Sequence, residues 1–374
     1  MKKIKILTVV GTRPEIIRLS RIINKFDIYF DHVLVNTTQN YDKELNEIFF
    51  KDLKIRKPDY NLGLIEKNSI KFIGKSLIEI NKILTKEKPD AFFILGDTNS
   101  TLSVIAAKKK KIPIFHMEAG NRCFDLRVPE EMNRKTVDHL SDVNLTYSKI
   151  ARQYLIKEGL DPEKIIHVGS PLPEVFNYFS KQISQSKILE KLKIKKNQYF
   201  LASIHREENT ENKENFKNIF DFFNLITEKY NKPIIISTHP RTMLKVINKK
   251  NLNKKIIFLK PMNFSDYNCL QINSYAVLSD SGTITEETSI LNLASINIRE
   301  SQERPEGMEQ STVIMTGTKI SNLLNSLEVT LKQKNKNIRF NKIDDYKSDN
   351  VSEKIPRIIL SYIDQINKKI WFKK

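Results

Sequence analysis

The 374-residue sequence is poor in cysteine and has no long apolar run. Cys123 and Cys269 stand alone, without the spacing of a zinc site, so the sequence indicates neither a cysteine-based metal centre nor a disulfide framework. The longest apolar stretches, such as 91–95 and 234–236, are far shorter than the roughly 20 residues that a membrane-spanning helix needs. We therefore expect reduced thiols and no membrane insertion.

Glycine is scarce as well, with ten residues, and none of them forms a GxGxxG or a Walker loop. Those loops bring the backbone close to phosphate groups, so their absence disfavours a dinucleotide-dependent or ATP-driven enzyme. The run 4–10 lacks the continuous apolar core of a secretory signal and alternates as a strand does. We expect a cytoplasmic protein.

Acidic side chains are outnumbered, with 44 Asp and Glu against 63 Lys and Arg, and the net charge is +19. A basic field attracts nucleic acids and anionic membranes. Here the excess is spread along the chain, and the lysine run 108–111 closes a predicted helix, where cations suit the helix dipole. We interpret the charge as solvated surface and expect no nucleic-acid partner.

Short β-rich runs alternate with helical patterns along almost the whole chain. This order predicts an α/β fold of parallel sheets covered by helices, in two domains because the length exceeds what one hydrophobic core usually serves. We place the first domain at 1–170, a linker at 171–196 and the second domain at 197–349, with a last helix at 350–367 that returns to the first domain. The predicted strands lie near 4–10, 30–36, 90–96, 112–117, 143–147, 165–168, 199–204, 233–238, 256–260, 275–279, 295–298 and 312–316.

Unusual polar residues follow several predicted strands. Ligands of open α/β sheets bind beyond the carboxyl ends of the strands, which is where chemistry is expected. Asp97, Glu118 and His205 stand at such ends, and a third acid, Glu130 or Glu131, opens a helix. Taken singly, each has a structural alternative: a helix cap, a buried ion-pair partner or a satisfied histidine. Together, three acids and a histidine at equivalent strand ends predict one acid–base site.

A second set of residues is suited to phosphate. The turn 281–283 leads into a helix, and amides at a helix start bind phosphate, although a simple capping turn is the alternative. Glu287, one turn further on, is a suitable acceptor for ribose hydroxyls. Arg13, Arg18 and Arg304 supply the cations that a diphosphate requires.

These motifs resemble those of the non-hydrolysing UDP-N-acetylglucosamine 2-epimerase family, and the resemblance extends over nearly the full chain. The motifs that carry it are Gly11-Thr12-Arg13-Pro14-Glu15, Gly96-Asp97-Thr98, Glu118-Ala119-Gly120, Pro129-Glu130-Glu131-Met132-Asn133-Arg134, His205-Arg206-Glu207-Glu208-Asn209, Asp280-Ser281-Gly282 with Glu286-Glu287, and Glu303-Arg304-Pro305-Glu306. The resemblance implies a GT-B-like architecture, with two Rossmann-like domains facing a cleft that binds a UDP-sugar. It also implies catalysis without a cofactor, and we expect a homodimer.

The reaction that the resemblance implies is inversion at C2 of the sugar. UDP is eliminated across C1–C2, and the bound 2-acetamidoglycal then takes UDP back with protonation from the other face. We assign proton transfer at C2 to Asp97 and Glu118, tuning or relay to Glu130, and the leaving phosphate to His205. The residues that match the family's substrate contacts are Arg13, Arg18, Arg134, Tyr267 (stacking on uracil), Ser281, Gly282, Glu287 and Arg304.

The segment 121–128 differs from the longer, Trp-containing loop of the UDP-GlcNAc enzymes. It resembles a capsule-type branch that acts on UDP-2-acetamido-2,6-dideoxy-L-talose, which implies a role in capsule or lipopolysaccharide biosynthesis. Interconversion of UDP-GlcNAc and UDP-ManNAc is the alternative. Others are a GT-B glycosyltransferase, a hydrolysing epimerase, a nucleotide-sugar sensor, and a metal site at Asp97, Glu118 and His205, although no metal is expected.

Overall fold

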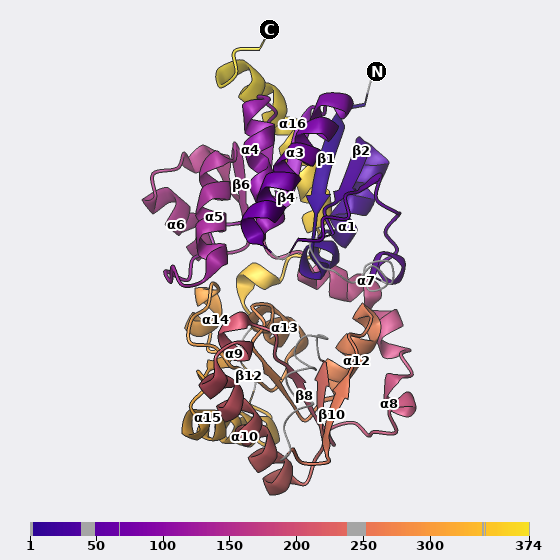
Figure 1. Cartoon of the computed structure of the whole chain (residues 1–374), viewed down its shortest axis with the longest axis vertical. Coiled ribbons are helices and arrows are strands. Elements are labelled where there is room, and N and C mark those ends of the chain that lie inside the picture. Colours follow the sequence, from indigo (N-terminus) through magenta and orange to yellow (C-terminus); the bar gives the residue numbers. More distant parts are fainter. Residues whose placement is uncertain are drawn as a thin grey trace. The chain divides into compact units, whose positions relative to one another are not determined.

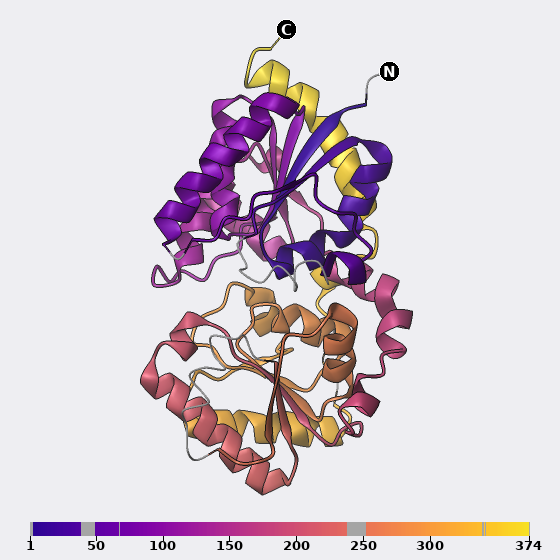
Figure 2. The same ribbon diagram turned by 45° about the vertical axis from the view of Figure 1, so that its right-hand side comes forward.

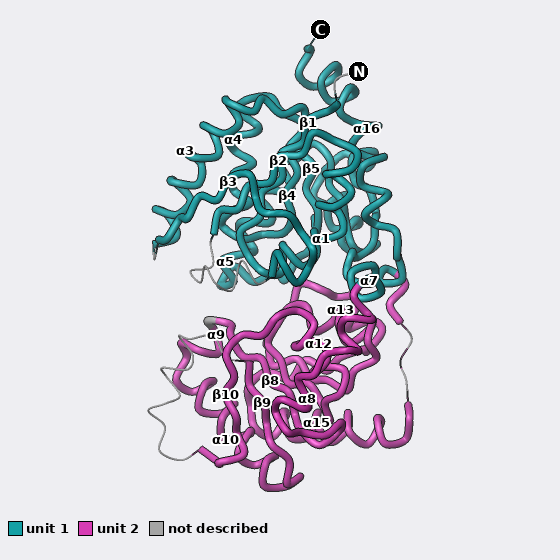
Figure 3. The backbone as a smooth tube through the Cα atoms, turned by 90° about the vertical axis from the view of Figure 1, so that its right-hand side faces the viewer, with its two compact units in different colours: residues 1–178, 345–374 teal, residues 179–344 magenta. Residues whose placement is uncertain are grey.

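The computed structural model of the chain describes residues 3–38, 49–66, 68–237, 252–338, 340 and 342–373. It divides into two compact units, one formed by residues 1–178 with 345–374 and the other by residues 179–344 (Figure 3). Their division falls inside a helix, within the stretch where the sequence predicted a linker.

The first unit is built on one parallel sheet of seven strands in the order β3-β2-β1-β4-β5-β6-β7. Its strands are β1 (Lys5–Val10), β2 (Asp31–Asn36), β3 (Tyr60–Asn61), β4 (Ala91–Leu95), β5 (Ile114–Ala119), β6 (Val143–Thr146) and β7 (Ile165–His167). Every residue of β4 is buried, as expected of a parallel strand that helices cover on both faces.

Helices cover both faces of this sheet, with α3 on one side and α1 and α16 on the other (Figure 2). The helical segments are α1 (Arg13–Tyr29), α3 (Ser69–Glu87), η1 (Asn99–Ser103), α4 (Val104–Lys109), α5 (Pro129–Leu140), α6 (Lys149–Lys157), η2 (Pro162–Lys164), α7 (Leu172–Ser184), η3 (Asp344–Tyr346) and α16 (Val351–Lys369). Helix α7 and the short η3 cross from one unit to the other. At the outer end of α1, Glu353 of α16 pairs with Lys25 and accepts the Tyr29 hydroxyl at 3.0 Å.

The second unit has a six-stranded parallel sheet in the order β10-β9-β8-β11-β12-β13. Figure 1 labels β8, β10 and β12 of this sheet. Its strands are β8 (Phe200–Ser203), β9 (Ile234–Ser237), β10 (Ile256–Leu259), β11 (Ala276–Ser279), β12 (Ser295–Asn297) and β13 (Ile314–Met315). Its helices are α8 (Ile188–Lys191), α9 (Glu207–Thr210), α10 (Lys213–Tyr230), α12 (Phe264–Asn273), α13 (Ile284–Leu291), α14 (Pro305–Glu309) and α15 (Ile320–Asn335). Phenylalanines of α10 and leucines of α15 pack with the strands in one core.

The two sheets confirm the predicted α/β class of two Rossmann-like domains, and each predicted strand is present. The short edge strand β3 was not predicted. In each unit the strand order reverses beside the first strand, between β1 and β4 and between β8 and β11. Such switch points are where ligands of doubly wound sheets bind. Among the residues that the structure describes, no helix is both long and apolar enough to cross a membrane.

Candidate active site

Asp97 follows β4 at the switch point of the first unit. Its side chain is one quarter exposed, and its Oδ2 accepts hydrogen bonds from Arg134 Nε at 2.9 Å and from a terminal nitrogen of the same guanidinium at 2.5 Å. Asn133 donates to the Asp97 carbonyl at 3.0 Å. Since Arg134 and Asn133 lie on α5, this helix fixes the acid from the side.

Glu118 lies at the end of the neighbouring strand β5. Where β5 pairs with β6 the register shifts between Met117 and Ala119, and Glu118 has φ of +69°, in the left-handed region. An extra residue in one strand changes the direction in which its side chain points. The positive φ is a strained backbone conformation for any residue with a Cβ. The carboxylate lies next to the β4 turn, because a Cβ built on Gly96 would be 3.9 Å from Glu118 Oε2. The two acids therefore stand at adjacent strand ends.

Arg18 and Asn121 are among the described residues that contact the Glu118 carboxylate. Arg18, on the second turn of α1 and buried, places a guanidinium nitrogen 3.4 Å from Oε2, and Asn121 Nδ2 is 3.4 Å from Oε1. An arginine thus lies beside each acid, Arg18 at Glu118 and Arg134 at Asp97. Asp97, Glu118, Arg18 and Arg134 lie within one unit, and their assignment to the site stays a prediction.

The paired acids at the start of α5 have different surroundings. Glu131 is fully buried and accepts hydrogen bonds from the Cys123 and Phe124 amides at 3.1 and 3.2 Å and from Arg134 at 2.8 Å. Glu130 is half-buried on the first turn. The sequence left the choice between these two acids open. Glu131 acts as the anchor of the 121–128 loop, and Glu130 stays the predicted third acid.

The turn between β1 and α1 has no room for a side chain at Gly11. A Cβ there would lie 2.3 Å from Ser100 Oγ and 2.5 Å from Thr37 Oγ1. Glu15 caps the helix by accepting the amides of Gly11 and Thr12 at 2.6 and 3.1 Å, and burial raises its pKa to about 7. This close turn sets where α1, and with it Arg18, begins.

Arg13 is the first residue of α1 and is half-buried. Its guanidinium lies over the Phe49 ring, 5.4 Å from the centroid. At this distance the cation interacts with the negative face of the ring. Arg13 thus lies at the start of α1, and its role toward phosphate stays a prediction.

In the second unit, His205 follows β8 and lies across the switch point from Asp280, which follows β11. The Asp280 carboxylate is fully buried and accepts the backbone amides of His205 at 3.0 and 3.1 Å and of Arg206 at 3.0 Å. The His205 ring is about half exposed, with Nδ1 3.2 Å from Asp280 Oδ1. The Asp280 carboxylate thus binds the backbone at His205 and lies beside its ring. Asp280 orients the histidine, a role that the sequence did not assign.

The turn after β11 is equally tight. A Cβ on Gly282 would lie 2.2 Å from Glu303 Oε1, and Ser281 Oγ is 2.9 Å from the Thr283 hydroxyl. Arg304 is buried and donates to Glu286 at 2.8 Å and to Glu303 at 3.1 Å. Arg304 is thus held by two carboxylates beside the turn predicted to bind phosphate.

Helix α12 lies next to this turn. Gln271 donates to Glu287 Oε2 at 2.5 Å, which joins α12 to α13. Tyr267 is half-buried one turn before Gln271, so both lie on the same face of the helix. The binding roles of Tyr267, Glu287 and the Ser281 turn stay predictions. Among the described residues, no three His, Cys, Asp or Glu side chains are grouped in a way that holds a metal ion.

Comparisons with known proteins point in one direction. A family model described as UDP-N-acetylglucosamine 2-epimerase matches residues 24–360. A UDP-N-acetylglucosamine 2-epimerase of Methanococcus maripaludis is 38% identical over 343 residues, 88% of this chain and 92% of the relative. A UDP-2,3-diacetamido-2,3-dideoxy-D-glucuronate 2-epimerase of Pseudomonas aeruginosa is 31% identical over 333 residues, 87% of this chain and 92% of the relative.

Solved structures are similar over both units. The UDP-N-acetylglucosamine 2-epimerase from Rickettsia bellii matches with a TM-score of 0.94 and 50% identity, covering 99% of this chain and 100% of that one. The Methanocaldococcus jannaschii UDP-GlcNAc 2-epimerase in complex with UDP-GlcNAc and UDP matches with a TM-score of 0.90 and 35% identity, covering 96% of this chain and 100% of that one. The GT-B-like pairing of two Rossmann-like domains is thus shared with these structures.

Proposed function

The chain belongs to the UDP-N-acetylglucosamine 2-epimerase family, which makes it an isomerase, and we propose on that premise that it inverts C2 of a UDP-N-acetylhexosamine by eliminating and re-adding UDP. The observation that carries the proposal is the placement of Asp97 and Glu118. They stand at adjacent strand ends of one unit, each beside its own arginine. Inversion needs proton transfer on both faces of C2, and one carboxyl group serves only one face.

The proposed reaction is an elimination of UDP followed by its re-addition. One carboxylate removes the C2 proton as the C1–O bond breaks, and UDP leaves with the electron pair. The glycal then receives a proton at C2 from the other carboxyl, on the opposite face, while UDP re-forms the bond to C1. An acid and a base are needed in each direction, and two carboxyl groups can supply one each. Glu130 is assigned to tune or relay these protons.

Each unit is assigned its own groups for the diphosphate. His205, whose Nδ1 faces Asp280, presents Nε2 for the leaving phosphate. Arg13, Arg18 and Arg304 contribute positive charge where negative charge develops. The remaining proposed substrate contacts are Ser281 and Gly282 for phosphate, Glu287 for the ribose, Tyr267 for uracil, and Arg134, which also holds Asp97.

The sugar itself is proposed from the loop 121–128. Phe124 and Leu126 are 66% and 78% exposed there, and Met132 on α5 is 60% exposed. The loop lies between Glu118 and Glu130 in the sequence, and exposed apolar side chains on it suit a sugar whose C6 is a methyl group. This favours UDP-2-acetamido-2,6-dideoxy-L-talose, the 6-deoxy substrate. The names of the similar proteins favour UDP-GlcNAc, which is the second candidate.

Solvent deuterium tests the reaction. After incubation in deuterated water with a chelator and without NAD, we expect deuterium at C2 of both epimers, because the proton leaves and returns. A glycosyltransferase would leave C2–H intact, and a hydrolysing epimerase would release free sugar and UDP. Epimerisation with C2–H fully retained contradicts the proposed mechanism.

Comparison of the two sugars at equal enzyme concentration tests the substrate. We expect a higher kcat/KM for the 6-deoxy talose derivative. An apolar site rejects an added hydroxyl only modestly, by about 100-fold, so some turnover of UDP-GlcNAc is expected as well. If UDP-GlcNAc is the better substrate, the 6-deoxy proposal is wrong while the 2-epimerase proposal stands.

A further inference from the structure

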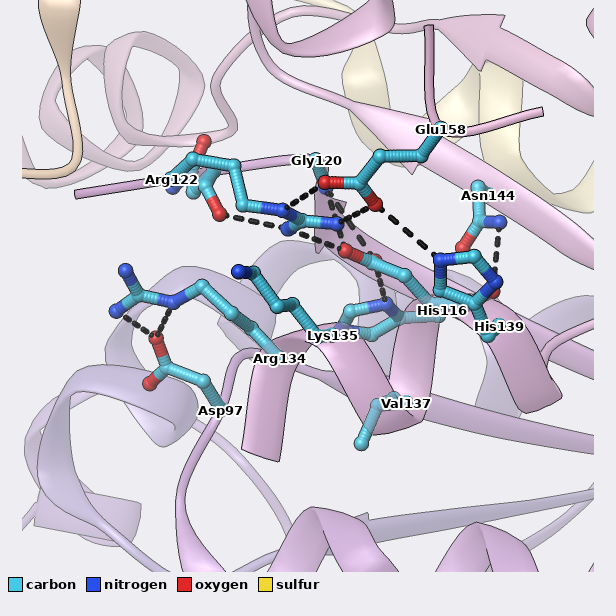
Figure 4. A network of polar contacts seen from close by, with 12 residues as sticks. Asp97, His116, Gly120, Arg122, Arg134, Lys135, Val137, His139, Asn144 and Glu158 are labelled. Atoms are coloured by element: carbon cyan, nitrogen blue, oxygen red, sulfur yellow. Dashed lines mark hydrogen bonds and ion pairs between the residues drawn. The ribbon is translucent and has the colours of Figure 1, made fainter. Parts of the chain in front are cut away.

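A buried polar network lies beside the two acids of the first unit. His116 on β5 and Asp138 on α5 are both fully buried, with His116 Nδ1 2.8 Å from Asp138 Oδ1. Arg122 donates to Asp138 Oδ2 at 2.7 Å and forms two hydrogen bonds with the Glu158 carboxylate, at 2.7 and 2.6 Å. His139 closes the far end, 3.2 Å from Glu158 (Figure 4). Because buried ion pairs add little net stability, stability alone does not account for this network.

The network is bonded to both acid-bearing turns. His116 Nε2 lies 2.9 Å from the carbonyl oxygen of Gly96, the residue directly before Asp97. Asp138 accepts the N–H of Gly120, two residues after the other acid, at 3.3 and 3.2 Å. One histidine–aspartate pair therefore connects the turn after β4 with the turn after β5.

The hydrogen-bond chemistry gives these contacts a direction. A backbone carbonyl only accepts, so His116 Nε2 carries the hydrogen that points at Gly96. Burial raises the pKa of Asp138, but the hydrogen bonds and charges of His116 and Arg122 outweigh it, and the pKa is lowered. Asp138 is therefore a carboxylate that accepts from three residues: His116, Gly120 and Arg122.

Glu118 is the residue that needs such support. Its φ of +69° and its place between the shifted pairs of β5 and β6 are a strained backbone conformation. Residues in such conformations persist only where the surroundings over-determine them. The Gly120 amide bound to Asp138 is fixed two residues beyond the strained position.

Helix α5 also reaches the other acid directly. Arg134 and Asp138 are one turn apart on α5 and share one face. Arg134 binds Asp97 and Asp138 binds the Gly120 amide, so a single helix contacts both acid turns.

We propose that His116 and Asp138 are positioning residues, which hold the turn before Asp97 and the turn after Glu118. By fixing these turns they keep both carboxyl groups in the positions needed for proton transfer at C2. This inference rests on the proposed function, because it deepens the role of the same two acids. His116 and Asp138 act through the turns and make no contact with the sugar.

Asp138→Asn is the first test, with Asp142→Asn as the matched control. Asp142 is also a buried acid bonded to β5, but at the opposite end of the strand, where it accepts the Ile114 amide at 2.9 Å and pairs with Lys108 at 2.6 Å. In Asp138→Asn one acceptor oxygen remains for donors from three residues, so a donor is left unpaired. We expect kcat to fall about 10- to 100-fold with KM changed by less than about 3-fold. Asp142→Asn is expected to keep kcat, while both variants unfold at a lower temperature.

His116→Gln and His116→Ala give a rescue test. A glutamine amide reaches the place of Nε2 and retains a donor toward the Gly96 carbonyl, whereas alanine has none. We expect His116→Gln to retain at least about 10-fold more kcat than His116→Ala, since about that much is lost when a catalytic group is misplaced. Equal kcat values in the two variants contradict the role of the Gly96 contact.

Crystal structures of Asp138→Asn and Asp142→Asn provide a readout that does not depend on activity. We expect residues 96–97 and 118–120 to move only in Asp138→Asn. If the wild type epimerises and Asp138→Asn matches Asp142→Asn in kcat and in these turns, the positioning inference is wrong and the proposed function stands. If the wild type epimerises no UDP-sugar, the proposed function fails, and the two crystal structures still decide whether Asp138 holds the turns.

Discussion

Glu15 is a carboxyl group enclosed at the first turn of α1, where it is 3% exposed. Burial raises its pKa from 4.5 to about 7, more than the amides of Gly11 and Thr12 lower it. Between those two pH values the folded protein binds a proton more tightly than the unfolded chain. The stability from this proton is therefore fully present below pH 4.5 and is lost as the pH rises through about 7.

Glu15→Gln tests this proton directly. Glutamine keeps an acceptor for the helix cap and resembles the protonated acid. We expect wild type and variant to unfold at similar urea concentrations near pH 5, and the variant to become the more stable protein by pH 8. The gap is on the order of 3 kcal/mol at most, since each pKa unit corresponds to about 1.4 kcal/mol. If the difference in unfolding free energy between wild type and Glu15→Gln is the same at every pH, the prediction is wrong.

Asp97→Asn and Glu118→Gln keep the shape of each side chain and remove its proton transfer. We expect each to lower turnover by about 100-fold or more, the scale of a missing general acid or base. UDP affinity, measured by titration calorimetry, is expected to change little, because these acids face the sugar in the proposed mechanism.

The control for this pair is Asp90→Asn. Asp90 lies before β4, at the opposite end of the strand from Asp97, and accepts the Lys5 amide at 2.8 Å. Its turnover is expected to equal that of the wild type. Near-normal turnover in both Asp97→Asn and Glu118→Gln removes the two acids from the mechanism.

At the scale of single elements, the strands were predictable and the details at their ends were not. β4 is a run of five apolar residues, which only a covered strand or helix explains, and its length favours a strand. β3 has two residues at the sheet edge and no pattern that could reveal it. Glu130 and Glu131 are adjacent in sequence, and which of them faces inward depends on the loop that Glu131 binds. The contact between Glu131 and the loop does not alter the spacing of apolar residues in the sequence, so that spacing could not reveal it.

The loop 121–128 depends on Glu131 as its anchor. Glu131 accepts the Cys123 and Phe124 amides and lies 3.2 Å from the Cys123 sulfur. Burial, together with the Glu131 carboxylate, raises the pKa of the Cys123 thiol. Glu131 therefore holds the loop in place. It also keeps the Cys123 thiol unreactive.

Glu131→Gln is expected to raise the reaction rate of Cys123 with a thiol reagent at pH 8 by about 3-fold or more, because the thiolate is the reactive form. The substitution removes a negative charge near the sulfur and replaces one acceptor oxygen with a donor. Absorbance of the released reagent group measures the rate. The double variant Glu131→Gln with Cys123→Ser serves as the control and should lose the fast phase, since Cys269 is buried. An unchanged rate contradicts the anchor role.

At the scale of the whole molecule, the sequence places the site residues at strand ends but does not reveal which strands are neighbours. Asp97 and Glu118 lie next to each other because β4 pairs with β5, and His205 meets Asp280 because β8 pairs with β11. Those pairings join segments far apart in the chain. The supporting contacts are equally remote, as Arg122 with Glu158 illustrates.

The net charge of +19 belongs to the whole chain, and it acts on any anionic ligand. A diphosphate carries about two negative charges, so a diffuse positive field favours its binding, and salt weakens this long-range attraction. We expect the Kd for UDP to rise by about 5-fold or more between about 0.02 M and about 0.3 M salt, where the screening length falls from about 20 Å to about 6 Å. Uridine, which has the same base and ribose but no charge, is the control, and its Kd is expected to stay nearly constant. Titration calorimetry measures both ligands. If UDP and uridine respond equally to salt, the charge of the chain has no part in binding the diphosphate.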